Sequence, residues 1–252
     1  MNEKRATAAA KLRELHVPGT PLLLPNAWDA ASARLVAAAG FPVVATGSAA
    51  VAESLGYPDG EGAPPGEMFA AAGRIVRAVD VPVTVDVEAG YGLAPAELAD
   101  RLAEAGAAGC NFEDTDHAGG GFIDLDRQAS RIAELRAADA DLVINARVDV
   151  FAHAEDQRAA LQDGVARAQA YLAAGADCAY PILIRDAGLL AEFVDAVRPD
   201  AVNALYLPDG PDLAALATLG VARISLGPGL FRTAQSYVEK VLRRLAAGEA
   251  PY

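Results

Sequence analysis

The chain has 252 residues, of which 53% are hydrophobic and 22% charged, and 34 acidic against 21 basic side chains give a net charge of −13. This composition is typical of a folded globular protein, and the acidic balance argues against binding nucleic acid through a broad basic surface. A local metal ion or arginine can still make one pocket attractive to an anionic small molecule.

Strands and helices are predicted to alternate along the chain, after a leading helix over 3–16 that stops at Pro18–Gly19. Strands are predicted over 21–25, 41–46, 81–88, 108–113, 141–147, 177–184, 201–207 and 221–226. Helices are predicted from 26 to about 40 and at 67–79, 94–105, 155–174, 186–197, 211–219 and 230–247. A further helix is predicted between the Gly-rich loop at 117–121 and about residue 138. The Gly- and Pro-rich segment 55–66 is predicted to be a loop.

Strict alternation implies parallel strands joined by helical crossovers. Eight such units over about 230 residues fit a closed (β/α)₈ TIM barrel better than an open doubly wound sheet. No G-x-G-x-x-G motif follows a strand, which weakens a dinucleotide-binding interpretation. The sequence therefore predicts an α/β fold, with one barrel domain over 1–252, a leading helix within 1–20 and a C-terminal helix within 228–252.

The two cysteines, Cys110 and Cys178, are far apart and lack CxxC spacing, so neither a zinc centre nor a disulfide framework is expected. Both are predicted to be packed thiols in the core. The charged N-terminal segment does not resemble a secretory signal, and no apolar run is long enough to span a membrane. A soluble cytoplasmic protein without membrane contact is expected.

Polar side chains collect at the C-terminal ends of the predicted strands, where barrel enzymes place their catalytic groups. The second strand ends in Thr46, Gly47 and Ser48, and the following loop carries Asp59; the third strand ends in Asp86 and Glu88, the fourth in Asn111, Glu113 and Asp114, and the fifth in Asn145, Arg147 and Asp149. Because strand side chains alternate between faces, Asp86 and Glu88 are expected to share one face. Asn111 with Glu113, and Asn145 with Arg147, are expected to do the same.

At least four carboxylates at one barrel mouth would repel one another unless a cation lay between them. Oxygen ligands without His or Cys favour Mg²⁺ or Mn²⁺ over zinc. Arg147 offers a planar fork for the carboxylate of a 2-oxo or 2-hydroxy acid. Two plainer interpretations stay open: solvated or helix-capping acids at Asp86 and Glu88, and a structural ion pair of Arg147 with Glu113 or Asp149.

Six segments together resemble the isocitrate lyase/phosphoenolpyruvate mutase superfamily. They are PNAWDAASA (25–33), ATGSAAVAESLGYPDG (45–60), VPVTVDVEAGYG (81–92), AGAAGCNFED (105–114), NARVDVF (145–151) and GVARISLGPGLFR (220–232). The resemblance implies a modified (β/α)₈ barrel, Mg²⁺ dependence and chemistry on the enolates of 2-oxo acids. It also implies a last helix exchanged between the subunits of a dimer, with dimers commonly pairing into tetramers.

The resemblance also implies roles for individual residues. Asp86 would ligate the metal directly and help to hold the substrate, while Asp59, Glu88 and Glu113 would hold the metal's water shell. Thr46–Gly47–Ser48 would bind the substrate carboxylate, and Arg147 its other end. Asp59, Glu113 and Arg147 would thereby belong to the catalytic set.

One region departs from the lyase pattern. Isocitrate and methylisocitrate lyases carry a K-[KR]-C-G-H loop after the fourth strand, whereas residues 115–126 read TDHAGGGFIDLD, without cysteine or lysine. Cys110 is expected to point toward the helices and cannot easily replace the loop cysteine. His117 is the candidate replacement acid or base, the alternative being a mobile surface histidine. Residues 119–121, three glycines, are either the hinge of a lid or a plain flexible loop.

The leading hypothesis is a Mg²⁺-dependent enzyme that cleaves a C–C bond in a small 2-oxo or 2-hydroxy dicarboxylic acid, similar to 2-methylisocitrate lyase or oxaloacetate decarboxylase. The second is P–C bond chemistry, as a mutase or phosphonopyruvate hydrolase, and the missing loop lysine counts against it. The third is a 2-oxo acid binding protein that has lost its acid/base group. Small carboxylates and further copies of the chain are the expected partners.

Overall fold

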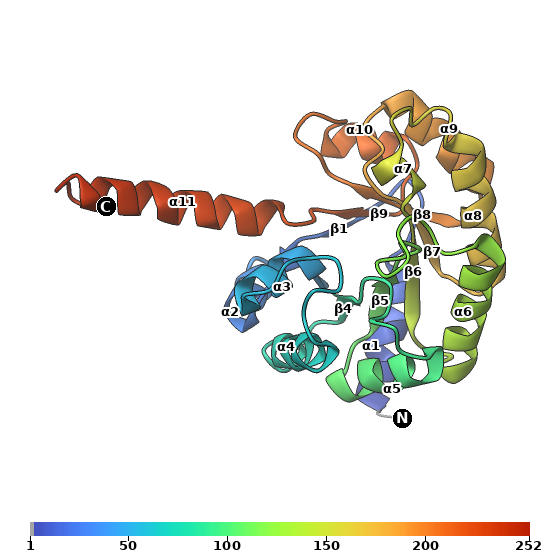
Figure 1. The fold of residues 1–252 in the computed structure, drawn as a ribbon, viewed down its shortest axis with the longest axis horizontal. Helices are drawn as coiled ribbons and strands as arrows, with labels where there is room; N and C mark the ends of the chain where they lie inside the picture. The colour runs from blue at the N-terminus through green and yellow to red at the C-terminus, as the bar shows by residue number, and fades with distance from the viewer. Residues whose placement is uncertain (1–2) are drawn as a thin grey trace.

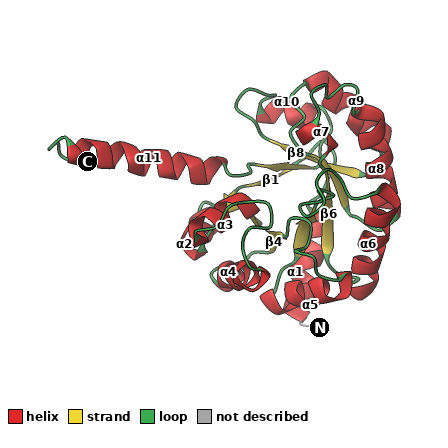
Figure 2. Cartoon of the chain, viewed as in Figure 1, coloured by secondary structure: helices red, strands yellow, loops and turns green. Residues whose placement is uncertain are grey.

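The protein, described here from a computed structural model over residues 3–252, forms a barrel of parallel strands surrounded by helices (Figures 1 and 2). The strands follow the order β1-β9-β8-β7-β6-β5-β4-β3-β2. Only Pro25 separates β1 from β2, so these two pieces act as one strand that pairs with β9 below and β3 above, and the row closes on itself. The predicted TIM-barrel fold is confirmed.

The strands are β1 (Leu22–Leu24), β2 (Asn26–Ala27), β3 (Val44–Thr46), β4 (Val83–Asp86), β5 (Gly109–Phe112), β6 (Val143–Val148), β7 (Cys178–Pro181), β8 (Ala201–Leu205) and β9 (Arg223–Ser225). The helices are α1 (Glu3–Glu14), α2 (Ala30–Ala38), α3 (Ser48–Leu55), α4 (Pro65–Arg77), α5 (Pro95–Ala105), α6 (Leu125–Ala138), α7 (Val150–His153), α8 (Leu161–Ala173), α9 (Ala187–Val197), α10 (Leu213–Thr218) and α11 (Gly229–Ala246).

Two helices, α3 and α7, were not expected, and the helix predicted over 155–174 begins only at residue 161. Asn26 was predicted to open the first crossover helix but lies in β2. The helix begins later because Asp29 caps it: its carboxylate accepts a hydrogen bond from the Ser32 backbone at 2.7 Å, and the Ser32 hydroxyl accepts one from the Asp29 backbone at 3.1 Å. This reciprocal capping box fixes the start of α2.

The core lies between the outer faces of the strands and the helices. Cys110 and Phe112 of β5 are fully buried there together with Ile132 and Leu135 of α6. Both cysteines are free and buried, and burial raises the pKa of each thiol, that of Cys178 to about 12. The prediction that they are packed core thiols is confirmed.

Helix α1 closes the lower end of the barrel. Leu12 and Ala9 pack against the inward side chains of Leu22 and Val143. Ion pairs at the rim fasten the helix: the buried Arg5 contacts Asp139 at 2.6 Å, and Arg13 contacts Asp177 at 2.6 Å while Arg136 contacts the other oxygen of Asp177 at 2.5 Å. The leading helix is therefore an integral part of the barrel.

We expect His16, at the end of α1, to make stability depend on pH. Burial, and next the charge of Arg223, lower its pKa from 6.5 to about 4. Between these values the unfolded His16 binds a proton that the folded one does not, so the contribution of His16 to the free energy of unfolding falls as the pH decreases through this window, by about 3 kcal/mol in total. The raised pKa values of Glu88 and Glu113 act in the opposite direction over the same window.

Urea unfolding at pH 7 and pH 4.5 measures this effect. Because the acids titrate in both proteins, the change in the free energy of unfolding from pH 7 to pH 4.5 should be about 2 to 3 kcal/mol more favourable to folding in His16→Gln than in the wild type. His153→Gln, at an exposed position, should behave like the wild type. An unchanged difference in His16→Gln would contradict the assignment.

Helix α11 leaves the barrel and projects from it (Figure 1). Its root is held by Phe231, whose ring packs edge-on against Trp28 with centroids 5.3 Å apart. The helix exposes large apolar side chains, namely Leu230 before this contact and Tyr237, Val238, Leu242 and Leu245 beyond it. Over residues 3–252, no helix combines the length and apolar character that crossing a membrane requires.

Candidate functional site

Asp86 stands at the upper end of β4, in the centre of the barrel mouth. Its backbone N–H donates to the Thr46 hydroxyl at 2.9 Å. Its carboxylate faces the backbone N–H and hydroxyl of Ser48 at 3.4 and 3.5 Å. Ser48 begins α3, so the positive end of this helix is directed at the carboxylate. Burial raises the pKa of Asp86, and the charge of Arg147 opposes that shift.

Glu88 joins Asp86 through a turn and not through strand alternation, because β4 ends at Asp86 and Glu88 has a left-handed backbone, with φ of 49°. Asp86 and Glu88 lie close together as predicted, but the expectation that they share one face of a strand is wrong. The Glu88 N–H reaches the Asp86 carboxylate at 3.3 Å. One carboxylate oxygen, Oε2, accepts from the Glu61 backbone, and the other, Oε1, is buried without a hydrogen-bond partner. Burial raises the pKa of Glu88 to about 7.

Glu61 is a site residue that the sequence interpretation missed. Its backbone N–H contacts Glu88, and its carboxylate accepts from the Tyr91 N–H at 2.5 Å, so the loop over 57–64 is fastened across the mouth. Glu61, Glu88 and Tyr91 all have left-handed backbones, with φ of 59°, 49° and 56°. Strained residues gather at functional sites where the surroundings enforce them. Asp59, in the same loop, is exposed, and its charge adds to the effect of burial on the pKa of Glu88.

Arg147, on β6, is held between two carboxylates. Its Nη1 contacts Glu113 at 2.5 Å, and its Nε and Nη2 contact Asp149 at 3.1 and 2.7 Å. The ion pair that the sequence left open as an alternative therefore exists, with both acids. Burial raises the pKa of Glu113 to about 7, against the opposing effects of Arg147 and His117. A bound anion at Arg147 has to share the guanidinium with these two acids.

Asp114 does not face the mouth as the strand-end pattern predicted. It turns outward to α8, where its carboxylate accepts from Tyr171 at 2.8 Å and from Arg167 at 2.9 Å. Its other oxygen accepts from the Asp149 backbone at 2.9 Å. The Thr115 hydroxyl completes this support by donating to Asp149 at 2.6 Å. This buried network fixes the position of Asp149, which in turn binds Arg147.

His117 reaches into the site. Its Nε2 lies 2.6 Å from the Glu113 carboxylate, and this hydrogen bond raises the pKa of His117. The loop that carries it is closed at its base by a bridge between Thr115 and Phe122. The structure therefore places His117 beside the carboxylates instead of leaving it as a detached surface residue.

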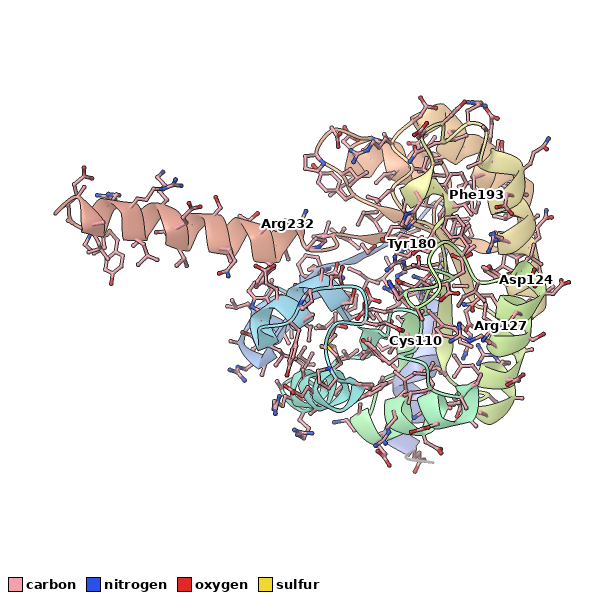
Figure 3. All side chains as sticks on the ribbon, in the orientation of Figure 1. Cys110, Asp124, Arg127, Tyr180, Phe193 and Arg232 are labelled. Atoms are coloured by element: carbon pink, nitrogen blue, oxygen red, sulfur yellow. The ribbon has the colours of Figure 1, made fainter. Side chains whose placement is uncertain are left out.

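Below the mouth the barrel interior is polar. Asn111 Oδ1 accepts from Asn145 Nδ2 and from Arg223 Nη2, each at 2.9 Å. Tyr180, which lies among the strands in Figure 3, is linked to Ser225 at 3.1 Å. Asn111 and Asn145 thus point into the barrel beneath Glu113 and Arg147, as their shared parity predicted, but they line the interior and not the mouth.

The carboxylate oxygens at the mouth are of the ligand type that Mg²⁺ and Mn²⁺ prefer. Across 3–252, no three His, Cys, Asp or Glu side chains are arranged to bind a metal ion among themselves. A site with Asp86 as the direct ligand and the other acids reached through water does not need such a group. Arg147 and His117 contact Glu113, whereas Oε1 of Glu88 has no hydrogen-bond partner, and a divalent cation would suit this side of the mouth.

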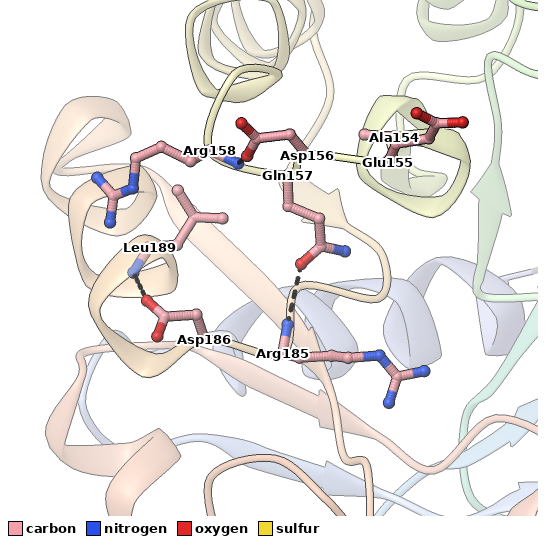
Figure 4. A pocket seen from close by; sticks show the side chains of 8 residues that line it. All are labelled: Ala154, Glu155, Asp156, Gln157, Arg158, Arg185, Asp186 and Leu189. Atoms are coloured by element: carbon pink, nitrogen blue, oxygen red, sulfur yellow. Dashed lines mark hydrogen bonds between the residues drawn. The ribbon is translucent and has the colours of Figure 1, made fainter.

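A separate surface pocket of about 610 Å³ lies after β6 and β7 (Figure 4). It is lined by Ala154, Glu155, Asp156, Gln157, Arg158, Arg185, Asp186 and Leu189. Its two arginines are already paired, Arg158 with Glu192 at 2.7 Å and Arg185 with Asp209 at 2.5 Å. The acids of the barrel mouth do not line it, so the candidate site is the mouth.

A family model described as phosphoenolpyruvate phosphomutase matches residues 12–246. The chain belongs to this family. Relatives named 2-methylisocitrate lyase and oxaloacetate decarboxylase place the family in the superfamily that the sequence resembled, so that prediction is confirmed.

Several relatives cover most of the chain. An uncharacterized protein of Mycobacterium tuberculosis is 37% identical over 85% of this chain and 80% of its own length. An oxaloacetate decarboxylase of Pseudomonas savastanoi is 33% identical over 78% of this chain and 70% of its own length. The crystal structure of a Burkholderia cenocepacia protein, provisionally named a phosphonomutase, is 44% identical with a TM-score of 0.89, covering 96% of this chain and 100% of that one.

Proposed function

We propose that the protein is a Mg²⁺-dependent carbon–carbon lyase that acts on a small 2-oxo or 2-hydroxy (di)carboxylic acid in the cytoplasm. The observation that carries the proposal is the gathering of Asp86 with the buried Glu88 and Glu113 at the barrel mouth, where one carboxylate oxygen of Glu88 has no hydrogen-bond partner. Relatives named 2-methylisocitrate lyase and oxaloacetate decarboxylase support this class of reaction.

Asp86 would hold the metal directly, and Asp59, Glu88 and Glu113 would hold its water ligands; Mn²⁺ is an acceptable substitute. A divalent cation there supplies Lewis-acid stabilisation of an enolate. The Thr46 hydroxyl accepts from the Asp86 backbone and can still donate its own proton, so it would anchor a substrate carboxylate together with the backbone of Gly47 and Ser48.

Arg147 would orient the other end of the substrate, in geometry set by Glu113 and Asp149. His117 would give or take the proton at the reacting carbon, since its hydrogen bond to Glu113 places it at the mouth and favours its protonated form. The loop over 116–121 would close over the site, with Gly120 and Gly121, at φ of 77° and 80°, as its hinge.

A thermal-shift screen with Mg²⁺ tests the proposal, using oxaloacetate, pyruvate, glyoxylate, 2-oxoglutarate, methylisocitrate and phosphonopyruvate, with NMR to detect turnover. Mg²⁺-dependent stabilisation with cleavage of a C–C bond supports it. Turnover of phosphonopyruvate alone would favour P–C chemistry. A relative named carboxyvinyl-carboxyphosphonate phosphorylmutase, from Arabidopsis thaliana, supports this alternative; it is 34% identical over 68% of the chain and 54% of its own length. Stabilisation without product would indicate a binding protein.

We further propose that α11 joins subunits into a dimer or tetramer by exchange. Exposed Tyr237, Val238 and Leu242 form an apolar face, and a groove of about 440 Å³ runs between this helix and Glu53 of α3. Substituting Tyr237 and Leu242 with serine should lower the molar mass measured by light scattering to that of a smaller assembly. Arg243→Ser is the control, and an unchanged mass in the double variant would contradict the role of α11.

A further inference from the structure

Arg223 occupies an unusual place, because the interior of a (β/α)₈ barrel is ordinarily filled by branched apolar side chains. It begins β9 and is fully buried. Its Nη2 donates to Asn111 Oδ1 at 2.9 Å, on β5. In the strand order β5 lies four places from β9, which is the opposite wall of the barrel. The side chain therefore crosses the interior.

The far end of this crossing is tied to the candidate site. Asn111 and Asn145 are register partners on β5 and β6, and they share a hydrogen bond of 2.9 Å. Glu113 and Arg147 each follow two residues later and form their own contact at 2.5 Å. The Arg223–Asn111–Asn145 group, named here the interior brace, thus lies one step below the ion pair at the mouth.

The charge of Arg223 is the feature that packing alone does not explain. Within the described part of the chain no carboxylate lies within ion-pair distance of it, and its Nε and Nη1 have no hydrogen-bond partner. Burying an unpaired charge costs several kcal/mol, which a leucine or methionine would avoid. Buried acceptors without partners are also found, at His16 Nε2, Asn145 Oδ1 and Asn203 Oδ1. Internal water joining such donors and acceptors is the usual solution.

We propose that Arg223 is a positioning residue, solvated by internal water, that sets the Glu113–Arg147 pair through Asn111 and Asn145. The inference rests on the proposed function, in which that pair belongs to the substrate site. It predicts that removing the guanidinium weakens ligand binding at the mouth although Arg223 touches no ligand. Losses of roughly 10- to 100-fold are typical when a supporting hydrogen bond of this kind is removed.

Calorimetry with oxalate and Mg²⁺ tests the proposal, since oxalate mimics the planar enolate of a 2-oxo acid. Arg223→Met should weaken oxalate binding roughly 10- to 100-fold, and Arg223→Lys should recover part of the loss. Arg5→Met is the matched control: it also removes a buried arginine, but from the lower rim, and it should bind oxalate like the wild type. Circular dichroism at the working temperature verifies that each variant is folded.

Wild-type affinity in a folded Arg223→Met would overturn the positioning role, as would an equal loss in Arg5→Met. Failure of the wild type to bind oxalate would count against the proposed function instead. Crystal structures of the wild type and Arg223→Met then test whether the interior brace positions the Glu113–Arg147 pair. In Arg223→Met the contact between Glu113 and Arg147 should lengthen, and its retention at 2.5 Å would overturn the inference. If Arg223→Met does not fold, the same measurements are made on Asn145→Ala, which removes another member of the interior brace.

Discussion

Asp86→Asn is expected to abolish Mg²⁺-dependent turnover, with a loss of roughly 1,000-fold or more, because a metal ion supplies several kcal/mol of transition-state stabilisation. Asparagine keeps the volume of the side chain and the backbone contact with Thr46, so the melting temperature should change little. Mn²⁺ titration followed by electron paramagnetic resonance measures metal binding without a known substrate.

Asp59→Asn is the control for this variant, since Asp59 is exposed and would reach the metal only through water. We expect it to retain measurable Mn²⁺ binding, weakened by roughly 10- to 100-fold. Full activity of Asp86→Asn, or undiminished wild-type activity in EDTA, would refute the metal assignment.

Arg5→Met is expected to lower the free energy of unfolding by about 3 to 5 kcal/mol, because it leaves Asp139 buried without its partner. The contact is 2.6 Å long, and both side chains are 4% exposed. Arg5 also donates to the Ala107 carbonyl at 3.2 Å, so the substitution removes a second bond at the lower rim. Urea denaturation at pH 7 measures the change.

The comparison is Arg101→Met, whose ion pair with Glu97 spans 3.5 Å and is half-exposed on both sides. Such surface pairs contribute about 0.3 to 0.5 kcal/mol. The double variant Arg5→Met/Asp139→Asn should recover part of the lost stability, since it leaves no buried charge and the asparagine oxygen can still accept from the backbone of Asp141 and Leu142. Equal effects of Arg5→Met and Arg101→Met would show that α1 is not fastened as described.

The fold was predictable because its signals are local. Glycine or proline bounds many of the crossover helices, and apolar runs mark the strands, so alternation alone led to a barrel. Helix α3 was missed because Gly47–Ser48 looked like the end of a strand, whereas Ser48 is already its first residue. The start of α2 was misplaced because the Asp29 capping box, and not the Asn26 side chain, decides it.

The site was predictable only where residues lie at the end of a strand or directly after it. Asp86, Glu113 and Arg147 do so and come together as expected. Glu61 lies in an irregular loop whose path depends on Glu88 and Tyr91, and sequence spacing carries no signal for such a path. Arg223 had a visible signal, a lone charge inside the apolar run VARIS, which went unused.

The attachment of α1 has a consequence for synthesis on the ribosome. The helix emerges before the barrel strands, yet Arg13 pairs with Asp177, 164 positions later, and Arg5 with Asp139, 134 positions later. At about 5 to 20 residues per second, roughly 8 to 33 s pass between the synthesis of Arg13 and that of its partner. Helix α1 thus completes its ion pairs only after most of the barrel strands have been made, and until then the lower end of the nascent barrel stays open to chaperones and proteases.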